Sequence, residues 1–111
     1  MTIQVAIQDR FAQMLAPLGD LRQTVDVALR RYAIEQITTK VTELRRRDQE
    51  FARKYGCDYE TFKSRSARDE RFVANVEQNI SKTWELDLAE WQFSHEGARD
   101  WVQRLEEILL P

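Results

Sequence analysis

Residues 2–9 read Thr2-Ile3-Gln4-Val5-Ala6-Ile7-Gln8-Asp9, and they are the main basis for the fold that we predict. Large apolar side chains recur there at every second position, which is the period of a β-strand with one buried face. A lone strand cannot satisfy its own backbone N–H and C=O groups, and the rest of the chain reads as helix. We therefore predict that the strand pairs with the same strand of a second copy, which makes the protein an obligate homodimer, with higher assembly left open.

The composition is typical of one open, mainly helical domain. Of 111 residues, 32% are charged, three are Gly and two are Pro, and the mean hydropathy is −0.62. The opening residues lack the apolar core of a secretory signal, and no run approaches the ~20 apolar residues of a membrane helix. The single cysteine, Cys57, has no partner for an intrachain disulfide. We expect a cytoplasmic protein with no membrane contact.

The net charge of −2 conceals an asymmetry along the chain. Residues 1–56 hold ten Lys and Arg against seven Asp and Glu, whereas residues 57–111 hold seven against twelve. A basic first half and an acidic second half indicate either two surfaces for different partners or simply solvated charged faces.

Beyond the strand, apolar residues follow the helical spacing of three and four. The pattern predicts a short helix over 10–18, a long helix over 21–55 capped by Asp20, and a helical turn over 58–63 capped by Asp58. A polar joint over 64–68 then leads into a last helix that runs almost to the end. The fold class that we expect is mainly α: an N-terminal β-strand followed by long helices that form a helical hairpin.

The first third of the chain carries a recognisable order of elements. A strand over 2–8, a helix over 10–18, the turn Gly19-Asp20 and a helix over 21–36 together resemble the ribbon-helix-helix family. The resemblance implies that two paired ribbons enter the DNA major groove. It also implies a set of DNA-contacting residues, namely Thr2, Gln4 and Ala6 on the ribbon, with Arg10 and Arg22 beside it.

Two features limit this DNA role. An amide such as Gln4 can bond adenine N6 and N7 together, but the outward ribbon face has no Lys or Arg. Asp20 also stands where a phosphate would approach a helix N-terminus, and its charge repels phosphate. The strand therefore either binds operator DNA with modest affinity or serves the dimer alone. On either reading, residues 1–44 form the dimerisation module, and residues 45–68 form a charged helix end and joint.

The last region, residues 69–111, is acidic and holds all three tryptophans. Tryptophan is the residue type most enriched at interface hot spots, and acidic residues around it complement a basic partner. The alternative is ordinary packing of this helix onto the long helix before it. The residues that we predict to bind a partner are Trp84, Asp87, Leu88, Trp91, Trp101 and Leu105.

The phrase over 54–62, followed by Trp84-Glu85-Leu86-Asp87-Leu88-Ala89-Glu90-Trp91, resembles small prokaryotic antitoxins. The resemblance implies an antitoxin of a toxin–antitoxin system, whose partner is a small basic toxin and which represses its own operon. Two alternatives stay open. One is a helical scaffold or adaptor with no DNA role, and the other is a plain transcriptional regulator.

No motif for catalysis stands out in the sequence. His95 is the only histidine, and its place on the apolar stripe favours a packing role. The acidic residues of the last third match no metal-ligand spacing, and no glycine loop of the phosphate-binding kind is present. We expect no catalytic residue, no metal site and no cofactor, so the protein is not an enzyme on this reading.

Overall fold

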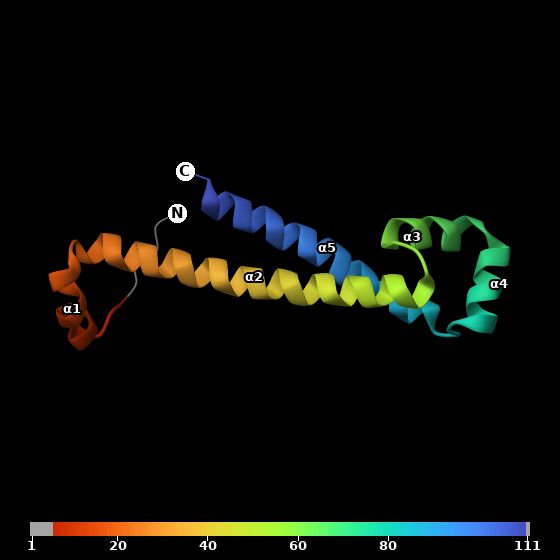
Figure 1. The fold of residues 1–111 in the computed structure, drawn as a ribbon, viewed down its shortest axis with the longest axis horizontal. Coiled ribbons are helices and arrows are strands. Elements are labelled where there is room, and N and C mark those ends of the chain that lie inside the picture. The colour runs from red at the N-terminus through yellow and green to blue at the C-terminus, as the bar shows by residue number, and fades with distance from the viewer. Residues whose placement is uncertain (1–5, 111) are drawn as a thin grey trace. The chain divides into compact units, whose positions relative to one another are not determined.

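The structure is a computed structural model that describes residues 6–110. The described chain folds into helices (Figure 1), which run in the order α1 (Asp9–Leu15), the 3₁₀ turn η1 (Ala16–Leu18), α2 (Leu21–Tyr55), α3 (Tyr59–Arg68), α4 (Glu70–Asn79) and α5 (Trp84–Leu109). The chain divides into two compact units, and the boundary between them falls between Glu35 and Gln36, within α2. We call them the N-terminal unit and the C-terminal unit and describe each by itself.

The predicted N-terminal β-strand is wrong, although the mainly helical class is confirmed. Residues 6–110 contain no strand, and Ala6 to Gln8 are irregular backbone in front of α1. Thr2 and Gln4 lie outside the described residues. Alternation over seven residues does not fix a strand unless a second strand pairs with it, and this stretch of chain supplies none. The ribbon-helix-helix fold is therefore wrong, and the dimer deduced from the unpaired strand loses its basis.

The N-terminal unit is short and has no core of its own. η1 carries Pro17 in its first turn and ends at Gly19, whose φ of 138° is open mainly to glycine. Asp20 then caps α2 as predicted, because its carboxylate accepts the backbone N–H of Arg22 at 2.9 Å. None of residues 6–35 is buried, so this unit lacks the packing from which helices in proteins draw most of their stability.

In the C-terminal unit, two signals separate α2 from α3. Gly56, at φ 73°, ends α2 in the left-handed region that glycine adopts freely. Asp58 then caps α3 by accepting the backbone N–H of Thr61 at 2.7 Å, as the sequence predicts. This carboxylate bond lowers the pKa of Asp58.

The joint expected over 64–68 is helical instead. α3 continues to Arg68, and the break falls at Asp69, which accepts the backbone N–H of Phe72 and caps α4. A second break, absent from the predicted pattern, separates α4 from α5 at residues 80–83. By contrast, α5 runs unbroken past Gly97. A Cβ at that position would lie 3.3 Å from Leu44 Cδ1, so glycine lets α5 approach α2 closely.

An aromatic cluster forms the core of the C-terminal unit. Its buried members come from α2, α3, α4 and α5, and each is at most 5% exposed: Tyr55, Tyr59, Phe62, Val76 and Trp91. A second set of buried apolar residues continues along the two long helices: Ile37, Val41, Leu44 and Ala98. Among residues 6–110, no helix is long and apolar enough to cross a membrane.

Candidate protein-binding surface

Trp91 is the residue that fixes α5 in the C-terminal unit. Its indole is fully buried and lies 5.5 to 5.9 Å, centroid to centroid, from the rings of Phe62, Tyr59, Phe51 and Tyr55. Offset and edge-on contacts at such distances add to the gain from burial. Since these rings belong to α2 and α3, one side chain joins three helices and determines which face of α5 points outward.

Asp48 of α2 satisfies the polar atoms of this aromatic core. One carboxylate oxygen accepts the indole N–H of Trp91 at 2.6 Å, and the other lies 2.8 Å from Nδ1 of His95. The His95 ring stacks on Tyr59 at 4.7 Å, and its Nε2 lies 3.7 Å from a carboxylate oxygen of Glu60. Both ring nitrogens of His95 thus face carboxylates, which is a packing and tethering arrangement with no nucleophile beside it.

Asp87 makes a second set of hydrogen bonds between α5 and α2. Its carboxylate accepts from Lys54 Nζ at 2.6 Å and from the Tyr55 hydroxyl at 2.5 Å. Burial by itself would raise the pKa of Asp87, but these two hydrogen bonds outweigh it and hold the pKa below its usual range. Burial and the same bond raise the pKa of Tyr55 well above its usual value.

We predict that acid weakens the C-terminal unit partly through Asp87. A carboxyl whose pKa is lower when folded stabilises the fold above its unfolded pKa, and this contribution is lost as the pH falls through the folded value. Urea unfolding followed by tryptophan emission should therefore show a smaller loss of stability between neutral and acidic pH in Asp87→Asn than in the wild type. An equal loss in both proteins would contradict this.

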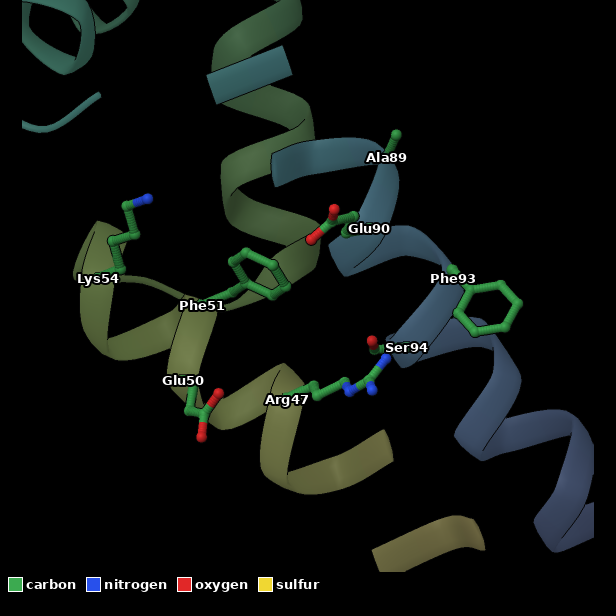
Figure 2. Close-up of a pocket in the computed structure, with 8 residues that line it drawn as sticks. All are labelled: Arg47, Glu50, Phe51, Lys54, Ala89, Glu90, Phe93 and Ser94. Atoms are coloured by element: carbon green, nitrogen blue, oxygen red, sulfur yellow. The ribbon is translucent and has the colours of Figure 1, made fainter. Parts of the chain in front are cut away.

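An open groove of about 760 Å³ runs between α2 and α5 (Figure 2). The α2 side presents Arg47, Glu50, Phe51 and Lys54, and the α5 side presents Ala89, Glu90, Phe93 and Ser94. Figure 2 shows Arg47 reaching from α2 toward Ser94 on α5. The lining mixes the aromatic side chains of Phe51 and Phe93 with charged ones, a combination suited to a segment of another protein.

The outward face of α5 is acidic with an apolar centre. At 100° per residue, Leu86, Ala89 and Phe93 fall on one side of the helix, opposite Trp91. Leu86 is 68% exposed and Phe93 is 64% exposed. The same side carries Glu85, Glu96, Asp100 and Glu107. We call these seven residues the acidic face; they lie on a helix with seven acidic and two basic residues.

The residues predicted from sequence to bind a partner lie mostly toward the core. Trp91 is buried, and the other five are half-buried: Trp84, Asp87, Leu88, Trp101 and Leu105. The indole N–H of Trp84 donates to Glu77, Asp87 is bound by Lys54, and the guanidinium of Arg104 covers the Trp101 ring at 4.5 Å. The outward positions Leu86 and Phe93 were missed. Their spacing of seven residues, on the side of α5 away from Trp84 and Trp91, was the available signal.

The residues predicted to contact DNA do not form a described surface. Thr2 and Gln4 are outside the described residues, and Ala6 is exposed in irregular backbone. Arg10 is exposed on α1 with its guanidinium over the Phe11 ring at 4.7 Å. Arg22 is exposed in the first turn of α2. The described positions Ala6, Arg10 and Arg22 therefore do not lie on a strand.

The remaining chemistry is sparse in the part of the chain that the structure describes. Burial raises the pKa of the Cys57 thiol, which disfavours the reactive thiolate. No group of His, Cys, Asp and Glu within residues 6–110 is arranged to hold a metal ion. The buried Tyr59 hydroxyl has no hydrogen-bond partner among the described residues.

Comparison of the chain with protein-family models, with curated proteins and with solved structures found no match.

Proposed function

We propose that this protein binds and covers a basic partner protein, the role of an antitoxin toward its toxin. The C-terminal unit binds the partner. The binding surface is the acidic face of α5 together with the groove beside it. Operator binding through an N-terminal ribbon is not part of this proposal.

The observation that carries the proposal is the pairing of exposed apolar residues with acidic ones on the acidic face. Leu86 and Phe93 are both about two-thirds exposed, although the core of the same unit is well packed. Large exposed side chains on an otherwise solvated helix are suited to be anchors in a partner's pocket. Acidic residues around them attract a basic surface and speed its approach.

The proposed role is tested by growth rescue. The product of the gene next to this one is expressed alone and together with this chain. We expect growth arrest alone and recovery with the wild type. Recovery should be lost when two acidic-face residues are reversed, in Asp100→Lys with Glu107→Lys, because like charges then meet across the interface.

The matched control reverses two exposed acids elsewhere, in Asp9→Lys with Glu70→Lys. It changes the net charge equally and should still rescue growth. Rescue by both double variants would overturn the acidic face as the binding surface. A neighbouring protein that binds without arresting growth would favour the adaptor role, and one that neither binds nor arrests growth would overturn the antitoxin role.

A further inference from the structure

The N-terminal unit leaves two apolar stripes open to solvent. On α1 and η1, Phe11 is 43%, Met14 69% and Leu18 74% exposed. On α2, Leu29 is 47% and Tyr32 62% exposed, next to the exposed Ala28. The spacing i, i+1 and i+4 places the α2 set on one side of that helix, and the spacing i and i+3 does the same for Phe11 and Met14 on α1. Leu18 lies beyond α1, in η1.

A unit of this kind is not expected to hold its helices by itself. None of residues 6–35 is buried. Amphipathic helices in proteins draw most of their stability from packing of the apolar face, and short isolated ones are marginal in water. The packing that residues 6–35 lack must therefore come from a segment or molecule beyond them.

We infer that a second copy of this chain covers these stripes, so that the protein is a dimer through its N-terminal helices. This inference does not depend on the proposed partner. It also replaces the strand-based dimer, because it rests on helix faces that the structure describes.

The exposed apolar area of the two stripes matches the apolar area that a stable dimer interface buries. The five side chains expose roughly 100 Å² each, or about 500 Å² per copy. Interfaces are about three-fifths apolar, so about 500 Å² of apolar surface corresponds to about 800 Å² in all. A stable interface of standard size buries about 800 Å² on each partner.

The charge of this unit fits a second copy better than a strongly charged partner. Residues 1–35 hold four Lys and Arg and four Asp and Glu, so the unit is neutral. Two such units meet without net repulsion, whereas the acidic face of α5 would oppose self-association. Ala28, the smallest residue of the α2 stripe, is the position where two copies of α2 can approach most closely.

The first test is the mass of the full chain in solution, by size exclusion with light scattering. We expect twice the chain mass of 13.2 kDa for the wild type at micromolar concentration. The double variant Leu29→Glu with Tyr32→Glu should be a monomer. The matched variant Leu86→Glu with Phe93→Glu adds the same charges to exposed apolar sites of the C-terminal unit and should stay dimeric.

Tryptophan emission keeps this test independent of folding, since all three tryptophans lie in the C-terminal unit. A monomeric variant with unchanged emission has lost association while its C-terminal unit keeps its fold. A monomeric wild type would overturn the inference, as would a double variant that stays dimeric.

A crosslink locates the interface. In a Cys57→Ser background, Ala28→Cys should form a disulfide between copies under mild oxidation, because its Cα atoms meet near the twofold axis. Gln23→Cys lies about 140° further round α2 and should not crosslink. Crosslinking of Gln23→Cys alone would overturn the assignment to the Ala28 stripe. If the protein is dimeric in these tests but does not rescue growth, the proposed binding of a partner protein is wrong and the dimer stands.

Discussion

Trp91→Ala is expected to lower the free energy of unfolding of the C-terminal unit by about 3–5 kcal/mol, the usual cost of removing a fully buried large aromatic side chain. The indole contacts four rings from α2 and α3, so its loss leaves a cavity where three helices meet. It also removes the N–H that satisfies Asp48. Because single domains are stable by only about 5–15 kcal/mol, we expect this variant to be near unfolding at room temperature.

Urea unfolding followed by far-ultraviolet circular dichroism measures this effect. Phe93→Ala is the matched control on the same helix, since its ring is 64% exposed and its loss should change stability by less than about 0.5 kcal/mol. If Trp91→Ala cost no more than Phe93→Ala, α5 would not be packed with Trp91 inward, and the orientation of the acidic face would be wrong.

The second large effect is expected at Asp48. Asp48→Ala removes the acceptor of the buried Trp91 indole N–H and leaves His95 Nδ1 without its carboxylate. A buried donor without an acceptor costs about 1–3 kcal/mol, and we expect about 2 kcal/mol here. Glu50→Ala, a nearby carboxylate on α2 whose ion pair with Arg46 is exposed, should cost less than about 1 kcal/mol.

A double-mutant cycle separates the hydrogen bond from other roles of Asp48. Trp91→Phe keeps much of the ring packing but has no N–H to donate. Asp48→Ala should therefore cost clearly less in the Trp91→Phe background than in the wild type. Equal costs in both backgrounds would show that the bond between Asp48 and the indole contributes nothing measurable.

Much of the helical architecture can be predicted from the sequence because its signals are local. Apolar residues every three or four positions predict α2 and the helical character of the last third, although not the break between α4 and α5. The predicted caps Asp20 and Asp58 stand at the starts of α2 and α3. Gly56 ends α2 at the residue that glycine freedom predicts.

The features that the sequence did not reveal depend on contacts between distant segments. The alternation of residues 2–8 is a valid strand pattern, but a strand exists only with a neighbour, and no local signal says whether one is there. Asp48 stands in a run of charged residues and looks like part of a solvated face, yet its partners Trp91 and His95 lie more than forty residues further along the chain.

The dependence on contacts between distant segments also explains why the partner-binding residues predicted from the sequence lie mostly toward the core. The stripe of Trp84, Leu88 and Trp91 predicts a helix with an apolar side, but periodicity does not say whether that side meets the chain itself or a partner. Because Trp91 is buried against α2 and α3, the inward side of α5 packs against the chain itself. This packing directs attention to Leu86 and Phe93, which it leaves exposed.

Titration calorimetry of the purified chain against the product of the gene next to its own tests directly whether the acidic face of α5 binds a basic protein. We predict binding that weakens as salt is added, because exposed charges are screened, and that is lost in the Asp100→Lys, Glu107→Lys variant while the Asp9→Lys, Glu70→Lys variant binds like the wild type. Absence of binding, or equal binding by both variants at every salt concentration, would contradict it.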